Sequence, residues 1–329
     1  MALTTGFLLT RHWRDTPTGI CLDFWVASEQ GPVHVSIPNQ QAIFFIRTAD
    51  SDSVAALLKR IGAISIKPLN LQSFRFELMS GVYFDSQQKL YRARDLLKQH
   101  NLACYESDIR PADRYLMERF ITAPVSIEFD DHQNMIQPAR LKPAKYTPTF
   151  EVMSFDIETD YVTNALFSIA FVSNNSRKVL IIGDNEDTSL IEYVDDEKTL
   201  LLRWIKYVID IDPDIFIGWN VVNFDLRVLQ TRSQTLGIPL TIGRSKMVPS
   251  WRKAQAETNH HFISIPGRIV LCGIDTLKSA TYNFASFSLE SVGQALLARG
   301  KLIHDSQSLH DPLFKAKEIQ RQFNEDKPQ

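Results

Sequence analysis

The feature that most constrains the fold is an apolar, strand-like run, Val152–Ile157, that contains one carboxylate and is followed at once by another. Asp156 and Glu158 stand two positions apart, and side chains at that spacing leave the same face of a strand, about 6–7 Å apart along it. Two carboxylates repel each other there unless a cation lies between them, and oxygen-rich sites suit Mg²⁺ or Mn²⁺. Acid pairs also occur at solvated strand ends, so the pair alone leaves both a metal site and a solvated strand end open.

The second half of the chain has the order of elements expected of an α/β domain. Apolar runs and helical periodicity alternate from residue 146 onward. Strands are predicted at 151–158, 166–173, 177–183, 214–219 and 268–274, and helices at 196–210, 224–236, 288–299 and 311–324. This order predicts a sheet of mixed direction flanked by helices over residues 146–329.

The first half has shorter elements. Alternating runs at 33–37 and 73–78 predict strands, and helices are predicted at 51–61 and 86–99. A chain of 329 residues is long enough for two domains, and a polar segment with prolines after residue 141 favours a boundary there. We therefore expect a smaller α+β domain over residues 1–145.

A third carboxylate can reach the edge of the sheet where the acid pair lies. The predicted strand at 214–219 continues into Asn220–Asp225, which places Asp225 on the first turn of the next helix. Active sites of α/β proteins collect at strand ends. Three acids at one such edge make a two-metal site for phosphoryl chemistry credible.

Two of these segments together resemble the first two exonuclease motifs of family B DNA polymerases. They are Phe-Asp-Ile-Glu-Thr at 155–159 and the pattern Asn-x-x-x-Phe-Asp over Asn220–Asp225, and their order and separation also fit the family. Stretches at 10–17, 114–121 and 287–292 are similar to bacterial members. The resemblance covers nearly the whole chain.

The resemblance implies a proofreading 3′→5′ exonuclease domain of ribonuclease H-like fold, preceded by the N-terminal domain of the polymerase. It implies two divalent ions, Mg²⁺ or Mn²⁺, bound by Asp156, Glu158 and Asp225, which hydrolyse the 3′-terminal phosphodiester of DNA. Asn220 and Phe224 match the second motif and would contact the frayed 3′ nucleotide, Phe224 by stacking. Their alternatives are helix capping for Asn220 and core packing for Phe224.

The partners implied by the resemblance are a single-stranded 3′ end or primer-template DNA, the remainder of the polymerase chain and a sliding clamp. The family's third exonuclease motif, Tyr-x-x-x-Asp, is not found after the second. Tyr91 and Asp95 have its spacing but precede the first motif, and the sequence ends at Gln329. We therefore expect the chain to be truncated before that motif, to lack DNA synthesis, and to be a poor exonuclease.

Bulk properties narrow the class of protein. A net charge of −2 argues against general coating of duplex nucleic acid. Residues 226–256 contain six basic residues and no acid, which favours either a phosphate site beside the metal or a solvated helix face and basic loop. Three scattered cysteines fit a reducing cytoplasm. The N-terminal sequence predicts neither a signal peptide nor a membrane span.

Several other residues are weaker candidates. Asp275 follows a predicted strand and could cap a helix or contact metal. His260 and His261 would face opposite ways on a strand, so exposure is the simpler prediction. Aromatic residues of the first half could stack on template bases, but core packing is the stronger expectation; they are Trp13, Trp25, Phe44, Phe45 and Tyr83.

Two other functions compete with a DNA exonuclease. One is a non-catalytic module that supports a polymerase and grips DNA, and the other is a nuclease that acts on RNA. The presence of all three acids, Asp156, Glu158 and Asp225, disfavours the non-catalytic module, since a decayed site would tolerate the loss of any of them.

Overall fold

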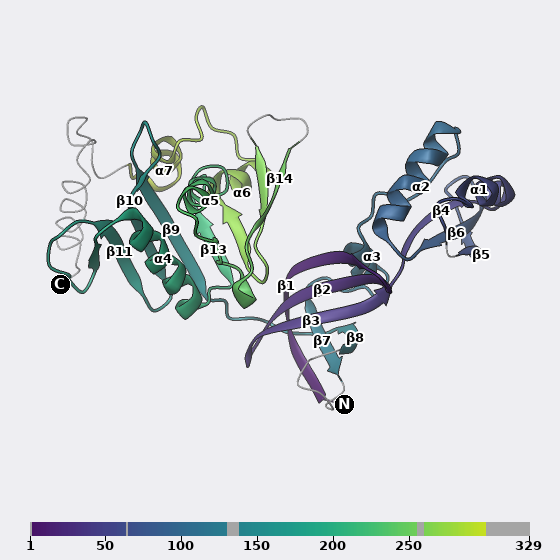
Figure 1. The fold of residues 1–329 in the computed structure, drawn as a ribbon, viewed down its shortest axis with the longest axis horizontal. Helices are drawn as coiled ribbons and strands as arrows, with labels where there is room; N and C mark the ends of the chain where they lie inside the picture. Colours follow the sequence, from purple (N-terminus) through teal and green to yellow (C-terminus); the bar gives the residue numbers. More distant parts are fainter. Residues whose placement is uncertain (1, 64, 130–137, 255–259, 301–329) are drawn as a thin grey trace. The chain divides into compact units, whose positions relative to one another are not determined.

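The computed structural model of the chain describes residues 2–63, 65–129, 138–254 and 260–300 (Figure 1). Its internal contacts divide it into two compact units, Met1–Thr149 and Phe150–Gln329. Each unit contains its own cluster of buried apolar side chains. No helix in the described ranges is long and apolar enough to cross a membrane.

Unit 1 contains two antiparallel sheets. The larger sheet has the order β3-β2-β1-β7-β8, and the smaller has the order β4-β6-β5. The strands are β1 (Ala2–Thr16), β2 (Gly19–Ser28), β3 (Gly31–Gln40), β4 (Ala42–Arg47), β5 (Ser65–Gln72), β6 (Leu78–Phe84), β7 (Pro124–Phe129) and β8 (Pro138–Pro143). The helices are α1 (Ser51–Leu58), α2 (Gln87–Gln99) and α3 (Pro111–Met117), with the short helix η1 (Thr48–Asp50).

The apolar core of unit 1 takes in both sheets. Phe24 of β2 and Phe44 of β4 are fully buried in the same cluster as Leu90 of α2. Trp25 is also buried, and Trp13 packs against the cluster, so core packing is confirmed for these aromatic residues and for Phe44. The predicted helices correspond to α1 and α2.

The prediction of a strand at 73–78 is wrong. Residues 73–77 form the turn between β5 and β6, with Phe74 fully exposed at its tip. The Ser73 hydroxyl accepts hydrogen bonds from the backbone N–H groups of Arg75 and Glu77, and this local bonding competes with strand pairing. An alternating apolar pattern alone does not reveal such a turn.

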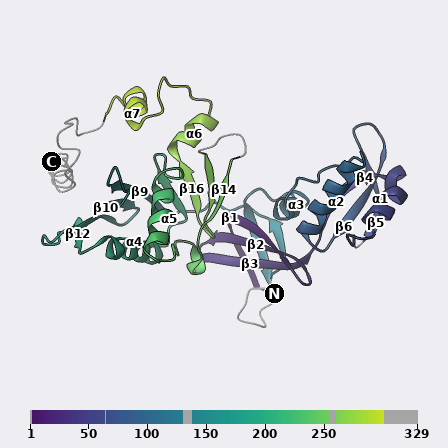
Figure 2. The same cartoon turned by 45° about the horizontal axis from the view of Figure 1, so that its top comes forward.

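Unit 2 is built on a six-stranded sheet with the order β12-β11-β10-β9-β13-β16 (Figures 1 and 2). These strands are β9 (Val152–Thr159), β10 (Leu166–Ser173), β11 (Arg177–Ile182), β12 (Ile191–Val194), β13 (Ile215–Gly218) and β16 (Ile269–Cys272). The strands β9, β13 and β16 run parallel to one another, whereas β10 is antiparallel to both β9 and β11. The sheet is therefore of mixed direction, as predicted.

Helices and a hairpin complete unit 2. They are α4 (Glu197–Ile211), α5 (Asp225–Thr235), η2 (Arg244–Lys246), α6 (Gly273–Ser279), α7 (Leu289–Leu297) and the hairpin of β14 (Ser250–Lys253) and β15 (His261–Ser264). Helix α4 packs on β10 and β11, and its buried Trp204 lies 5.3 Å from the ring of Phe155. The helix predicted at 311–324 lies outside the described residues.

Candidate active site

The acid pair lies at the C-terminal end of β9, on the face predicted from the strand period. Met153, Phe155 and Ile157 are buried against the core, whereas Asp156 is exposed and Glu158 half-buried. The alternation places both carboxylates on the side of β9 opposite Trp204. Because β9, β13 and β16 are parallel, their C-terminal ends meet at this same edge of the sheet.

Asp225 reaches this edge through a hydrogen bond to the backbone of β9. Pairing between β13 and β9 stops at Ile217 and Ser154, so the N–H of Ile157 has no strand partner on that side. The Oδ1 atom of Asp225 accepts a hydrogen bond from this N–H at 3.2 Å. A buried backbone N–H needs an acceptor, and the carboxylate supplies it. Asp225 is 1% exposed as a result.

The burial of Asp225 brings two carboxyl groups into contact. The pKa of Asp225 is raised to about 7, chiefly by burial and next by the charge of Asp156, with a smaller contribution from a hydrogen bond with the Asp156 side chain. Backbone hydrogen bonds, including the one from Ile157, oppose this rise. Two acids that share such a site cannot both ionise easily. The pair therefore holds a proton near neutral pH, or exchanges that proton for a cation.

Asn220 and Phe224 connect β13 to α5 in a tight turn. Asn220 has φ 58°, a left-handed conformation that asparagine tolerates better than most residues, and its carbonyl accepts a hydrogen bond from the Phe224 N–H. Phe224, not Asn220, is the N-cap residue of α5, so the capping alternative for Asn220 is wrong. Phe224 is 41% exposed, which likewise excludes the core alternative for its ring.

Within the described residues, no three acidic, histidine or cysteine side chains are close enough to form a ready metal cage. The contact between Asp156 and Asp225 nevertheless supplies the oxygen ligands that a hard divalent ion requires, with Glu158 on the same strand face. The donor chemistry of the two carboxyl groups in contact therefore fits a hard divalent ion.

Of the weaker candidates, Asp275 lies at the same edge of the sheet as the three acids, because α6 begins directly after β16. Asp275 is in the first turn of α6, and it lines a cavity of about 560 Å³ together with His260 and His261. The two histidines are only partly buried, and the Nδ1 atom of His260 lies 3.4 Å from the Asn223 amide nitrogen. Tyr91 and Asp95, which have the spacing of the third motif, lie in α2 of unit 1.

Neither interpretation of the basic stretch 226–256 describes it fully. Arg232 forms a two-pronged ion pair with Glu197 of α4, with both nitrogen–oxygen distances 2.6 Å. Arg227 and Arg252 lie over the rings of Trp251 and Phe262. Arg244 is buried at 5% exposure. Arg232 and Arg244 therefore stabilise the fold through ion pairs with acids that are distant in sequence. Arg227 and Arg252 stabilise it through contacts with aromatic rings.

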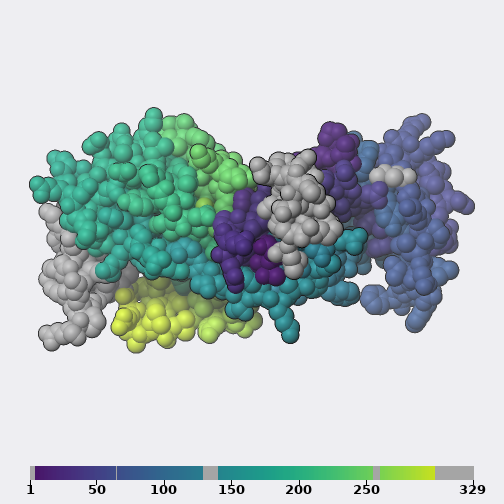
Figure 3. Space-filling model, turned by 90° about the horizontal axis from the view of Figure 1, so that it is seen from below, coloured from purple at the N-terminus to yellow at the C-terminus, as the bar shows by residue number. Residues whose placement is uncertain are grey.

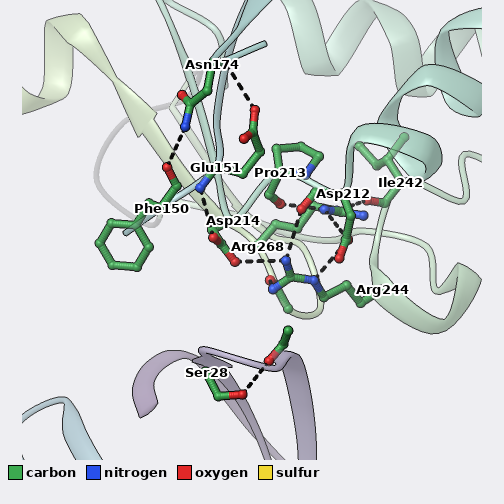
Figure 4. A network of polar contacts seen from close by, with 12 residues as sticks. Ser28, Phe150, Glu151, Asn174, Asp212, Pro213, Asp214, Ile242, Arg244 and Arg268 are labelled. Carbon is green, nitrogen blue, oxygen red and sulfur yellow. Dashed lines mark hydrogen bonds and ion pairs between the residues drawn. The ribbon is translucent and has the colours of Figure 1, made fainter. Parts of the chain in front are cut away.

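Sequence reasoning missed a buried polar network at the opposite edge of the same strands (Figure 4). The Arg244 guanidinium donates to Asp214 Oδ1 at 2.8 Å and pairs with Asp212 at 3.1 Å. Arg268 donates to the Ile242 carbonyl at 2.7 Å and pairs with Asp212 Oδ1 at 2.9 Å. Burial lowers the pKa of Arg268 to about 10 although Asp212 raises it.

This network joins segments at the N-terminal ends of β9, β13 and β16. The Oδ2 atom of Asp214 accepts a hydrogen bond from the Glu151 N–H at 3.0 Å, which fixes the residue before β9. The ion-paired residues lie 30 or more positions apart in sequence, so no local sequence pattern predicts their pairing. The one available signal is that residues 226–256 contain no acid, so an ion-pair partner of Arg244 must come from another part of the sequence.

Comparisons with known proteins agree with this architecture. The profile of DNA polymerase family B, exonuclease domain, matches residues 99–292, and that of DNA polymerase II, N-terminal, matches residues 6–41. The chain is 39% identical over 329 residues to DNA polymerase II of Escherichia coli (strain K12), which covers 98% of this chain and 41% of that protein. It is 27% identical over 228 residues to a DNA polymerase of Thermococcus gorgonarius, covering 67% of this chain and 26% of that protein.

A solved structure shows the same fold. The family B DNA polymerase from the hyperthermophilic archaeon Pyrobaculum calidifontis superimposes with a TM-score of 0.78 at 16% identity, over 98% of this chain and 44% of that one. The chain thus spans less than half the length of these relatives. Because the match to the exonuclease domain covers residues 99–292, more than half of the chain, the chain belongs to DNA polymerase family B and contains the exonuclease domain of that family.

Proposed function

We propose that unit 2 hydrolyses the 3′-terminal phosphodiester of single-stranded DNA, with two divalent ions, Mg²⁺ or Mn²⁺, bound by Asp156, Glu158 and Asp225. The observation that supports this most strongly is the meeting of Asp156 and Asp225 at the C-terminal edge of β9 and β13. Exonuclease domains of this family are metal-dependent nucleases, and the DNA polymerase II of Escherichia coli shares 39% of its aligned residues with this chain.

The residues have distinct roles in this proposal. When bound, divalent ions supply positive charge that stabilises the attacking and leaving oxygens of a phosphodiester. Asp156 and Asp225 bind and orient them, and Ile157 fixes Asp225 through its backbone N–H. Glu158 completes the ligand set and orients the attacking water. The exposed ring of Phe224 stacks on the terminal base, and Asn220 contacts its nucleotide.

The remaining parts of the proposal concern the whole polymerase. Primer-template DNA and the rest of the polymerase chain are the expected partners, a sliding clamp is a further prediction, and the cytoplasm is the expected location. A non-catalytic DNA-binding module is the alternative that a nuclease assay separates from this function.

The test is a nuclease assay with the chain in excess over 5′-labelled single-stranded oligonucleotides of DNA and RNA. We expect slow, Mn²⁺-dependent loss of nucleotides from the 3′ end of DNA, abolished in Asp156→Ala and unchanged in Asp210→Asn, an exposed acid near the end of α4, which leads to the opposite edge of the sheet. Equal product from the wild-type chain and Asp156→Ala would contradict a catalytic role for this site. Preferential cleavage of RNA would replace the proposed substrate.

A further inference from the structure

An aromatic loop follows α6 and is not used by the proposed chemistry. It comprises Tyr282–Phe287 and contains three aromatic rings in a row. Tyr282 and Phe284 stack with their centroids 5.9 Å apart and their planes 5° apart, and Phe287 meets Phe284 edge-on at 5.4 Å. Tyr282 remains 50% exposed. In the space-filling view, the yellow segment that contains α7 lies at the surface of unit 2 (Figure 3).

The aromatic loop is anchored to the segment that carries the candidate site. The Trp219 indole N–H donates a hydrogen bond to the Phe287 carbonyl at 3.2 Å. Gly273 makes room for the Trp219 ring, because a Cβ atom at that position would lie 2.7 Å from it. Trp219 directly precedes Asn220, so one side chain links the aromatic loop to the turn that carries Asn220 and Phe224.

Strand order places the start of this loop near the carboxylates. The loop follows α6, which begins directly after β16, and β16 is parallel to β13 and β9 (Figures 1 and 2). Neighbouring strands lie about 4.8 Å apart, so the ends of β9 and β16 are about 10 Å apart. Helix α6 has seven residues and adds about 10 Å, so the loop begins within about 20 Å of the end of β9, a distance that a few nucleotides of a single strand span.

A cation lies between the aromatic loop and the neighbouring cavity. The Lys278 Nζ atom is 5.2 Å from the centroid of the Phe287 ring. Lys278 also lines the cavity of about 560 Å³ with Thr276, Ser279 and the two histidines, and Asp275 is the one acid among its described lining residues. An ammonium group beside a cluster of aromatic rings, one of which is exposed, is the combination that binds phosphates and bases of single strands.

We propose that Tyr282, Phe284 and Lys278 form a binding track for the unpaired nucleotides that precede the scissile one. A base stacks on the free face of the exposed Tyr282 ring, which Phe284 supports from its other face, and a phosphate pairs with the ammonium group. The track binds without base-specific contacts, because every base presents a stacking face. This inference rests on the proposed exonuclease function, whose polynucleotide substrate it requires.

The test measures binding and not cleavage. The chain is titrated against a fluorescein-labelled oligothymidylate in EDTA, where no divalent ion is bound, and anisotropy reports the affinity at several salt concentrations. We expect Tyr282→Ala and Phe284→Ala each to weaken binding about fivefold to a hundredfold. Tyr282→Trp should retain or improve the affinity. Lys278→Gln should reduce the slope of log K against log salt by about 0.7, the value for one phosphate contact on a single strand.

Matched controls separate stacking from loss of structure. Tyr193→Ala removes an aromatic residue of β12, at the other edge of the sheet, and Lys206→Gln removes an exposed cation of α4; both should leave affinity and salt slope unchanged. An affinity in Tyr282→Ala and Phe284→Ala equal to that of the wild-type chain overturns the track. So does an absence of oligonucleotide binding by the wild-type chain. Neither result decides the proposed function, which depends on the cleavage assay with Asp156→Ala.

Discussion

The two ends of the parallel strands β9, β13 and β16 hold acids in opposite electrostatic settings. At the N-terminal end, Asp212 and Asp214 meet the guanidinium groups of Arg244 and Arg268. At the C-terminal end, the buried carboxyl of Asp225 meets the carboxyl of Asp156. The first arrangement neutralises its charges within the chain, whereas the second requires a proton or a cation. The first end therefore stabilises the fold, and the second end is the one to which the proposed function assigns the metal.

Removing one arginine tests the stabilising end and should have the largest effect. Arg268→Met removes one of the two guanidinium groups that pair with Asp212. It also leaves the carbonyls of Ile242 and Pro213 without the hydrogen-bond donor that Arg268 supplies. Loss of one partner from a buried ion pair costs about 3–5 kcal/mol. Urea unfolding, followed by hydrogen exchange of β9 amides, measures this change in the free energy of unfolding.

A surface pair is the control for that measurement. Lys206 and Asp210 form an exposed pair on α4, with 61% and 53% of their side chains exposed. Lys206→Met should change the free energy of unfolding by less than about 0.5 kcal/mol. Equal effects of Arg268→Met and Lys206→Met would mean that the buried network does not stabilise unit 2.

At the C-terminal end of the strands, the stability of the fold should depend on pH through Asp225. The pKa of Asp225 is raised from 3.8 to about 7 in the folded chain. A raised folded pKa contributes stability that is present below pH 3.8 and is lost as pH rises through about 7. Three pKa units correspond to about 4 kcal/mol. In metal-free buffer, the stability of the wild-type chain relative to Asp225→Asn should therefore fall by up to that amount between pH 4 and pH 8.

The uncharged variant makes this prediction specific. Asparagine at position 225 keeps the shape of the side chain and does not ionise, so titrating groups other than the pair of Asp156 and Asp225 cancel in the difference between the two proteins. A stability difference that stays constant from pH 4 to pH 8 would show that Asp225 ionises normally. The measurement is urea unfolding of both proteins across that range.

Glu197 tests a third electrostatic setting, that of a partly buried acid paired with a single arginine. Glu197 pairs with Arg232 and accepts a hydrogen bond from the Leu166 N–H at 2.9 Å. Although burial opposes it, bonding to Arg232 and this N–H lowers the pKa of Glu197, so its contribution is lost as pH falls through that lowered pKa. Glu197→Gln should cost about 1.5–3 kcal/mol at pH 7, the value of hydrogen bonds to charged groups. A cost that persisted in full below pH 3 would not come from the ion pair.

The sequence predicted the sheet and the acids well because both depend on local patterns. Alternation in Met153–Ile157 placed Asp156 and Glu158 on one face, and the end of β13 placed Asp225 in the first turn of α5. Strand β12 was missed because its four residues include the charged Glu192, whereas the equally short β13 and β16 were predicted because they are continuous apolar runs. The network of Arg244 and Arg268 was missed because its partners are set by the folded topology.

Mn²⁺ binding to the chain, followed by electron paramagnetic resonance, tests the central claim most directly. The wild-type chain should bind Mn²⁺ at pH 8, and Asp156→Asn and Asp225→Asn should each weaken binding by about tenfold or more, since even groups that only support metal ligands can cost that much. Asp210→Asn, at an exposed position near the end of α4, should leave the affinity unchanged. Mn²⁺ affinity that is equal in the wild-type chain, Asp156→Asn and Asp225→Asn would contradict the assignment of the metal site to this edge of the sheet.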